Sequence, residues 1–241
     1  MHPVGYTTGA LCRGDWQTAL CILRDSRFTA IELGTLREWE FMGLLSHLPT
    51  LDVSKYDAVS VHCPKIQKMT EEKLTEDLSP IYDRGWNITV HPYVIKNPKL
   101  WKKFGSQLCI ENMGTSTKSS KASEWVGQDV DGLSPFFNDL PDASMCFDIG
   151  HAIQMDETTE LAENLIDSFG DRVKIIHLSK VNPSGEHLPL TVEPIRALGR
   201  VITRLPMDCA IIIESDARET YDKEVILTNG AFAESGIRVL W

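Results

Sequence analysis

Six apolar segments of the sequence each end in a histidine or a carboxylate. A small or apolar residue stands two positions before each of these polar residues, so alternation along a strand would point both side chains to one side. The polar residues that end the segments are His62, His91, Glu111, Asp148, His177 and Glu214. Imidazoles and carboxylates together are ligands for Zn²⁺, Mn²⁺, Fe²⁺ or Co²⁺. The pattern therefore predicts a divalent-metal site that does not depend on thiolate ligands.

The segment Met145–Asp148 carries this pattern most clearly. It is expected to be a buried strand that ends at Asp148, with His151 on the loop just beyond. A single histidine in such a place is more often structural, but here five of the seven histidines lie at or just past strand ends: His62, His91, His151, His177 and His187. Inward carboxylates gathered at one place would repel each other, and a divalent cation removes that cost.

The candidate ligands must be carried by a repeating set of elements. Short β-rich segments alternate with amphipathic helical ones, as where Asp15 is placed to cap a helix with Trp16, Ala19 and Leu23 on one face. The expected strands cover residues 4–8, 29–33, 58–62, 87–91, 107–111, 145–148, 173–178 and 209–214. Eight such units predict an α/β chain folded as one (β/α)₈ TIM barrel domain over residues 1–241, with its mouth at the carboxyl ends of the strands. An open doubly wound sheet is the rival, but no glycine-rich phosphate turn follows the first strand.

Further residues are expected around this mouth. Glu32 and Tyr6 point the same way and are candidates for substrate contact, although Glu32 could equally support a metal ligand or be satisfied in the core. A packed layer just below the ligands is expected to contain Ser60, Thr89, Cys109 and Cys146. Lysines that follow strand ends could hold a phosphate or carboxylate of the substrate, although each alone is more often a solvated loop residue: Lys65, Lys68, Lys96, Lys118, Lys121 and Lys180.

The composition disfavours some classes of function. The formal net charge of −10 makes DNA an unlikely partner, because a nucleic-acid binder presents a basic face. No apolar run is long enough to span a membrane, and the first residues lack the pattern of a signal peptide. The six cysteines are scattered without a CxxC pair, which favours reduced, buried thiols over a disulfide framework. A cytoplasmic location is therefore expected.

With these residues in place, the chain resembles the xylose isomerase-like barrel superfamily, which includes sugar isomerases and epimerases together with endonuclease IV. The resemblance covers nearly the whole chain. It is carried by Ile110-Glu111-Asn112, Asp148-Ile149-Gly150-His151, His177-Leu178-Ser179, Gly185-Glu186-His187-Leu188-Pro189-Leu190 and Ile213-Glu214. Each motif is weak alone, and their order and intervals make the set fairly specific.

For the isomerase and epimerase branch, the resemblance implies one divalent ion bound by Glu111, Asp148, His177 and Glu214. Glu111 and Glu214 would also be the paired acid and base on opposite faces of the substrate, while His151 and Lys180 would orient substrate oxygens. The expected substrate is a small sugar-like molecule, with a phosphorylated or acidic one allowed.

For the endonuclease IV branch, the resemblance implies a three-zinc cluster in which His62, His91, His151 and His187 join the same four residues. Metal-activated water would there attack a phosphodiester in abasic DNA. The sequence departs from this pattern at Gly185, where an acidic ligand is expected, and Glu186 beside it would point elsewhere.

A metal-binding barrel without catalysis is a third alternative, because a fold does not name a reaction. We favour the isomerase or epimerase, with one divalent ion (Zn, Mn, Fe or Co) against two or three for the nuclease. A homo-oligomer is compatible with the resemblance, but the sequence selects no partner face.

Overall fold

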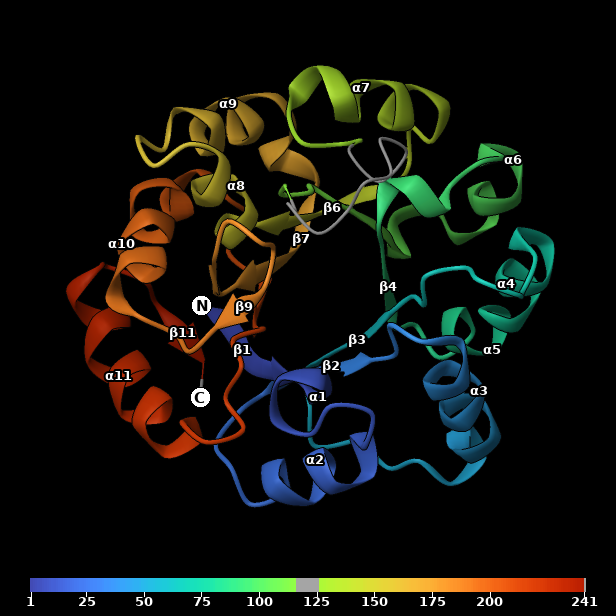
Figure 1. Cartoon of the computed structure of the whole chain (residues 1–241), viewed down its shortest axis with the longest axis horizontal. Coiled ribbons are helices and arrows are strands. Elements are labelled where there is room, and N and C mark those ends of the chain that lie inside the picture. The colour runs from blue at the N-terminus through green and yellow to red at the C-terminus, as the bar shows by residue number, and fades with distance from the viewer. Residues whose placement is uncertain (116–125, 241) are drawn as a thin grey trace.

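The computed structural model describes residues 1–115 and 126–240, so Lys118 and Lys121 lie outside the described residues. Its centre is a closed barrel of eight parallel strands, which closes through the pairing of the last strand with the first. In chain order these strands are β1 His2–Thr7, β2 Ala30–Gly34, β3 Ala58–His62, β4 Asn87–Val90, β5 Leu108–Glu111, β6 Ser144–Asp148, β7 Val173–Leu178 and β10 Ala210–Ile213. The predicted (β/α)₈ TIM barrel is therefore confirmed, and Figure 1 looks down its axis.

Helices form a ring outside the strands (Figure 1). They are α1 Thr8–Leu11, α2 Trp16–Leu23, α3 Glu38–His47, α4 Glu71–Asp77, α5 Ser79–Tyr82, α6 Pro98–Trp101, α7 Val130–Asp139, α8 Ile149–Met155, α9 Glu160–Phe169, α10 Val192–Val201 and α11 Tyr221–Glu234. Short 3₁₀ turns are η1 Leu48–Thr50, η2 Pro92–Val94, η3 Lys102–Gln107, η5 Gly170–Arg172 and η6 Ile202–Arg204.

Local sequence explains why several helices begin where they do. As predicted, the Asp15 carboxylate caps α2 by accepting a hydrogen bond from the backbone N–H of Thr18, at 2.9 Å. Thr70 caps α4 in the same way, through the backbone N–H of Lys73. The sequence signal for α7 is weak because Pro135 lies inside it, but Asp129 caps it and Leu133 packs into the core.

The core has an outer and an inner part. Most buried apolar side chains lie between the strands and the helices, whereas a small separate cluster fills the inside of the barrel. This inner cluster contains Ala30, Cys109, Cys146, Ile175, Ala210 and Ile212. The prediction that Cys109 and Cys146 form part of a packed inner layer is therefore confirmed, and the six cysteines, all within the described residues, are unpaired.

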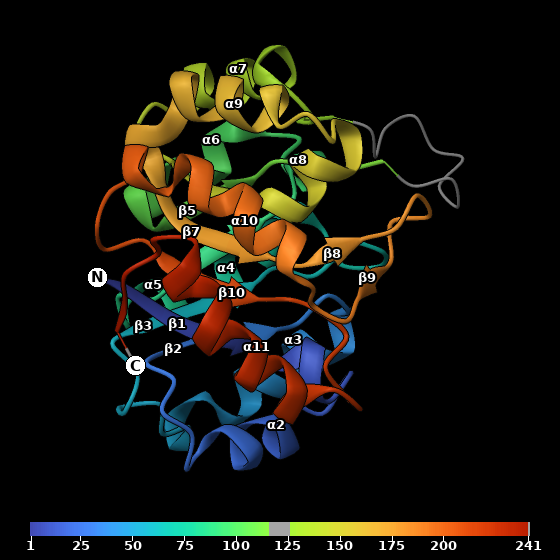
Figure 2. The same cartoon turned by 90° about the vertical axis from the view of Figure 1, so that its left-hand side faces the viewer.

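Additional strands lie at the two ends of the barrel. The segment expected to be a loop over residues 182–189 belongs to a small antiparallel hairpin, β8 Lys180–Val181 and β9 His187–Leu188, which projects from the mouth in Figure 2. At the opposite end, β11 Val239–Leu240 pairs with the start of β1, where both termini lie (Figure 2). Within the part of the chain that the structure describes, no helix is both long and apolar enough to cross a membrane.

Candidate metal centre

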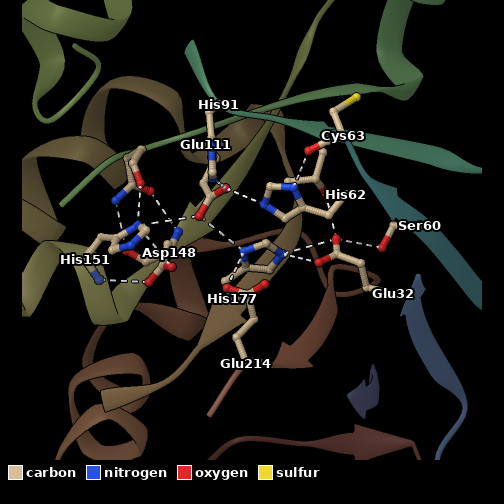
Figure 3. Close-up of polar contacts among 12 residues, drawn as sticks. Glu32, Ser60, His62, Cys63, His91, Glu111, Asp148, His151, His177 and Glu214 are labelled. Atoms are coloured by element: carbon tan, nitrogen blue, oxygen red, sulfur yellow. Dashed lines mark hydrogen bonds and ion pairs between the residues drawn. The ribbon is translucent and has the colours of Figure 1, made fainter. Parts of the chain in front are cut away.

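Glu111, the last residue of β5, lies at the centre of the histidines predicted from the sequence. Its side chain is buried, and its Oε2 atom lies 3.1 Å from Nε2 of His62 and 3.2 Å from Nε2 of His91. Its Oε1 atom lies 3.4 Å from Nδ1 of His177 and 3.5 Å from Nδ1 of His151. The two carboxylate oxygens of Glu111 therefore face two different groups of imidazoles (Figure 3).

The structure brings together the four residues expected to share one ion. Glu111, Asp148, His177 and Glu214 each offer a ligand atom, and these atoms all lie within 4.8 Å of one another. Glu111 and Asp148 end neighbouring strands, β5 and β6, while His177 is in β7 and Glu214 directly follows β10. A second group of potential ligands consists of His62, Glu111 and His177. The parallel register of a closed barrel produces this convergence, because all carboxyl ends meet at one mouth.

The donor set fits a divalent cation. Two ligands that each lie 2.0–2.1 Å from a tetrahedral ion are about 3.3 Å apart, and the Nδ1 atom of His177 lies 3.1 Å from Oε2 of Glu214. Asp148 Oδ2 is buried and lacks a hydrogen-bond donor among the described residues. Although Nδ1 of His151 lies 3.1 Å from this oxygen, it is aligned with the backbone carbonyl of Asn112, at 3.0 Å. A cation among these residues would satisfy Asp148 Oδ2.

Burial and charge shift the ionisation of the carboxylates. Burial opposes ionisation of Glu111, but the neighbouring imidazoles of His91 and His177 outweigh it and hold the pKa well below its ordinary value. Burial also opposes ionisation of Glu214, but His177 outweighs burial and lowers the pKa of Glu214 to about 2. Burial dominates at Asp148 and raises its pKa to about 7, with His151 only partly opposing the shift. Glu111 and Glu214 are therefore the carboxylates that stay ionised most readily.

The two histidines next to Glu111 Oε2 differ in charge. Burial disfavours the cation of His62, but its hydrogen bond with Glu111 outweighs burial and raises the pKa of His62 to about 9. For His91 burial prevails over Glu111 and lowers the pKa to about 4. The Nδ1 atom of His62 lies 3.1 Å from the carbonyl of Cys63, and that of His91 lies 2.7 Å from the hydroxyl of Tyr93. In both rings Nε2 is left facing Glu111.

His151 lies in a helix, so the expectation of a loop at this position is wrong. α8 starts directly after β6, and Asp148 caps it by accepting a hydrogen bond from the backbone N–H of His151, at 2.8 Å. The tight turn requires Gly150, because a Cβ atom there would lie 2.6 Å from the backbone oxygen of Ser179. The motif Asp148-Ile149-Gly150-His151 is therefore a strand-to-helix turn that holds an acid and an imidazole side by side.

Asn112, the last residue of the motif Ile110-Glu111-Asn112, holds the backbone of Asp148 in place. Its side chain is fully buried and bonds both backbone groups of Asp148, with Nδ2 donating to the carbonyl at 2.9 Å and Oδ1 accepting from the N–H at 2.8 Å. Asn112 thereby ties the end of β6 to the residue that follows β5. Its position directly after Glu111 is the only sequence signal that could have found it.

His187 approaches the cluster from the β8–β9 hairpin. Its ring centroid lies 5.8 Å from that of His151, and burial lowers its pKa. Gly185 has a φ of 77°, a left-handed value that suits glycine, and the carboxylate of Glu186 accepts a hydrogen bond from Nδ2 of Asn182 at 2.9 Å. At the position where the resemblance to endonuclease IV expects an acidic ligand the chain therefore has a glycine, and the neighbouring Glu186 is hydrogen-bonded within the hairpin.

A cavity of about 710 Å³ opens above the cluster. Its lining includes His62, His91, Glu111, His151, His187 and Glu214. Lys65 lines it as expected, whereas Lys180, Lys68 and Lys96 are not among the described lining residues. Three arginines that the sequence reasoning passed over also line the cavity: Arg13, Arg37 and Arg218. Arg13 and Arg218 follow the first and last barrel strands, so the rule applied to lysines would have found them.

The structure places neither Glu32 nor Tyr6 where a molecule in the cavity would touch it. Both side chains are fully buried and lie outside the described cavity lining. The prediction that Tyr6 faces the mouth is wrong. Tyr6 pairs in register with Ile31, while its neighbour Thr7 pairs with Glu32 and lines the cavity. Tyr6 points outward instead, and its hydroxyl donates to Glu224 of α11 at 3.4 Å.

Comparison with known proteins supports the fold. No sequence-family profile and no curated protein sequence matches the chain. Among solved structures, a D-tagatose 3-epimerase-like protein is similar, with a TM-score of 0.62 and 13% sequence identity. A D-psicose 3-epimerase in the presence of D-fructose is also similar, with a TM-score of 0.55 and 13% sequence identity. An uncharacterised protein from Parabacteroides distasonis is similar with a TM-score of 0.58 and 16% identity. Each comparison covers 97% of this chain and 98% of the other. These likenesses show that the chain shares its barrel fold with the three structures.

Proposed function

We propose that the chain is a divalent-metal-dependent isomerase or epimerase that acts on a small sugar-like substrate. The observation that carries this proposal is the convergence of Glu111, Asp148, His177 and Glu214 at one mouth, beneath a cavity of about 710 Å³. The barrel fold shared with a D-psicose 3-epimerase and a D-tagatose 3-epimerase-like protein agrees with it. We further propose that residues 1–241 act as one cytoplasmic domain.

Glu111 and Glu214 are proposed as the acid–base pair. Both line the cavity, and both are ionised over the neutral range because their pKa values are lowered. Either carboxylate can therefore accept a proton from a carbon next to a substrate carbonyl, and that protonated carboxyl can return the proton to carbon. Return from the opposite face requires that the other carboxylate first takes up a proton from solvent. The bound ion, held by Glu111, Asp148, His177 and Glu214, would polarise that carbonyl and acidify the C–H bond.

Cations around the cavity would select among sugar-like substrates. Lys65, Arg13, Arg37 and Arg218 line the cavity, while Arg37 is paired with Glu40 and Arg218 with Asp216. Lys65 and Arg13 are thus proposed to accommodate a phosphorylated or acidic substrate. His151, at the side of the cavity, is proposed to orient a substrate oxygen. Lys180 remains a proposal from the sequence that the cavity lining does not support.

Solvent deuterium exchange tests this function without knowledge of the substrate. The protein loaded with Mn²⁺ or Co²⁺ is incubated in D₂O with a panel of ketoses and their phosphates, and deuterium incorporation at carbon is followed by NMR. We expect exchange with at least one member, and its loss in Glu111→Gln and in Glu214→Gln. A His47→Ala variant is the control, because His47 is exposed at the end of α3. Absence of exchange from every metal-loaded sample would contradict the proposal.

One observation favours a second function. Oε2 of Glu111 faces Nε2 of His62 and His91, whereas Oε1 faces Nδ1 of His177, so the two oxygens of this carboxylate could each serve a different ion. A two-metal cluster suits hydrolysis of a phosphodiester, as in the endonuclease IV branch of the resemblance. The acidic balance of the chain counts against DNA as that substrate.

Metal stoichiometry separates these two functions. Elemental analysis after reconstitution should find one ion per chain for the isomerase or epimerase and two or three for the hydrolase. In the second case His62→Ala and His91→Ala would each reduce the content by one ion, and the wild-type chain would nick an abasic-site duplex while Glu111→Gln would not. A chain that binds no ion and is unaffected by Asp148→Asn would support a binding module instead.

A further inference from the structure

Glu32 is a carboxylate inside the barrel that the proposed chemistry does not use. It lies in β2, is fully buried, and its Oε2 atom accepts hydrogen bonds from the hydroxyls of Ser60 at 3.0 Å and Thr89 at 2.8 Å. Its two oxygens lie 3.2 and 3.3 Å from Nε2 of His177. β2 pairs with β1 and β3, so Glu32 reaches His177 of β7 across the interior rather than along the sheet (Figure 3).

The two nitrogens of the His177 ring face different partners. Nε2 faces Glu32, whereas Nδ1 lies 3.1 Å from Oε2 of Glu214 and 3.4 Å from Oε1 of Glu111. A neutral imidazole carries its proton on one nitrogen and a lone pair on the other. Without an ion, burial opposes the cation of His177, but the charged neighbours of the ring outweigh burial and raise the pKa of His177 well above its ordinary value. Once a cation takes the place of the Nδ1 proton, a hydrogen bond from Nε2–H to Glu32 would keep the remaining proton on Nε2 and leave Nδ1 as the coordinating atom.

We propose that Glu32 is a positioning residue, which holds the proton of His177 on Nε2 and the ring in place, so that Nδ1 is presented as a metal ligand. The inference rests on the proposed metal site. Ser60 and Thr89 keep the carboxylate in place by donating two hydrogen bonds to one of its oxygens. A carboxylate behind a histidine ligand also raises the basicity of the coordinating nitrogen.

Another side chain also interacts with the same ring. The Cys146 thiol is close to His177, but burial raises the pKa of that thiol well above its ordinary value, so it is neutral. Glu32 is therefore the carboxylate that can fix the protonated nitrogen of His177 from the side away from Glu111 and Glu214.

Metal affinity measured by competition with a chromophoric chelator tests the inference, with Zn²⁺ as the probe. We expect Glu32→Gln to lower the affinity by about 10- to 100-fold, the usual effect of losing a carboxylate behind a histidine ligand. In a His177→Ala background, which keeps the three carboxylates, the same change should cause no further loss. Non-additivity of this kind shows that Glu32 acts through His177, and a purely structural acid would not produce it.

Two further variants keep the test decisive. Glu32→Asp retains the charge but withdraws the carboxylate by one methylene, so it should fold and lose affinity in the same direction. Glu71→Gln is the control, because Glu71 accepts hydrogen bonds from the Trp101 indole and the backbone of Asn97, away from the ligands. It should leave the affinity unchanged within about twofold. Unfolding of the metal-free variants reports separately on stability.

The outcomes distinguish this inference from the proposed function. If the wild-type chain binds no metal ion, both are overturned. If the wild-type chain binds metal and the folded Glu32→Gln and Glu32→Asp variants bind it equally well, only the role of Glu32 is overturned. Full additivity with His177→Ala would also overturn it, because Glu32 would then act by another route.

Discussion

At the scale of single residues, the surroundings of each carboxylate decide its chemistry. Glu111 and Asp148 end adjacent strands at the same mouth, and both are buried. Glu111 is ringed by imidazoles that favour its ionised form, whereas burial dominates at Asp148 and raises its pKa to about 7. In the metal-free chain the charge of Glu111 is therefore compensated by neighbouring imidazoles, whereas Asp148 is costly to ionise.

Asp148→Asn should stabilise the metal-free protein while it weakens metal binding. The folded-state pKa of Asp148 lies above its ordinary value of 3.8, so its ionisation lowers stability as pH rises from 3.8 to about 7. At pH 8 we expect the variant to gain about 1–4 kcal/mol in the free energy of unfolding. The gain should vanish below pH 3.8, where both states are protonated.

Denaturant unfolding of the metal-free proteins across this pH range measures the effect. An Asn oxygen can still accept the hydrogen bond that caps α8, so the helix start is preserved. A loss of stability at pH 8 would contradict the prediction, and so would an unchanged Zn²⁺ affinity.

Tyr6→Phe tests the corrected position of Tyr6. Its hydroxyl contacts Glu224 outside the barrel, so its removal should lower stability by about 1 kcal/mol and leave metal affinity and KM unchanged. Tyr93→Phe is the matched variant at the mouth, because the Tyr93 hydroxyl lies 2.7 Å from Nδ1 of His91 and the residue lines the cavity. Tyr93→Phe should change metal affinity or KM more than it changes the free energy of unfolding. A change in KM for Tyr6→Phe alone would restore the original expectation of substrate contact.

At the scale of elements, the site depends on how tightly each strand turns into the next helix. The turn from β6 into α8 brings Gly150 against Ser179, which follows β7, and this contact sets where His151 lies relative to Asp148. Periodicity could not reveal this helix, because α8 has only seven residues and its side chains are mostly buried.

Gly150→Ala and Gly43→Ala should have opposite effects on stability. A Cβ atom at Gly150 would lie 2.6 Å from backbone oxygen, so α8 must shift, which should cost about 1–3 kcal/mol and displace His151. Gly43 lies within α3, and a Cβ atom there would meet nothing within 4 Å, so alanine should stabilise by about 0.5–1 kcal/mol. Thermal unfolding compares the two. Equal and small effects would show that the contact with Ser179 relaxes freely.

At the scale of the whole molecule, closure of the barrel brings ionisable side chains together at its mouth. The strands close into a cylinder, so ionisable residues of β3, β5, β6 and β7 meet His91, which follows β4, and Glu214, which follows β10, at one mouth. Folding therefore concentrates carboxylates and imidazoles that are dispersed in the unfolded chain. A cation that binds only the folded chain should be coupled strongly to stability.

Metal removal should therefore lower the unfolding temperature. Zn²⁺ or Mn²⁺ at a hundredfold excess over its dissociation constant should stabilise the wild-type chain by about 2.7 kcal/mol, and a chelator should reverse the gain. Differential scanning fluorimetry of the wild-type and Asp148→Asn proteins measures both effects. An identical shift in the two proteins would place the stabilising ion outside the predicted cluster.

The sequence alone determined the barrel and the polar strand-end residues that converge in it. Alternation places every second residue of a strand on one face, and the carboxyl ends of parallel strands share one mouth, so six polar strand-end residues could be brought together without coordinates. The resemblance to the xylose isomerase-like barrels then singled out four of them, Glu111, Asp148, His177 and Glu214. The same rule of alternation placed Cys109 and Cys146 inside the barrel. These features depend on local order along each strand, which the sequence carries directly.

Only the tertiary structure decided which neighbour each side chain meets. Tyr6 was placed on the wrong face because the register of β1 against β2 depends on strand pairing, and a shift of one residue exchanges inside and outside. The contact of Glu32 with His177 crosses the barrel between strands that do not pair. The division of Glu111 between two groups of imidazoles likewise depends on distances between strand ends. Such contacts join residues far apart in the chain, and closure of the barrel alone brings them together.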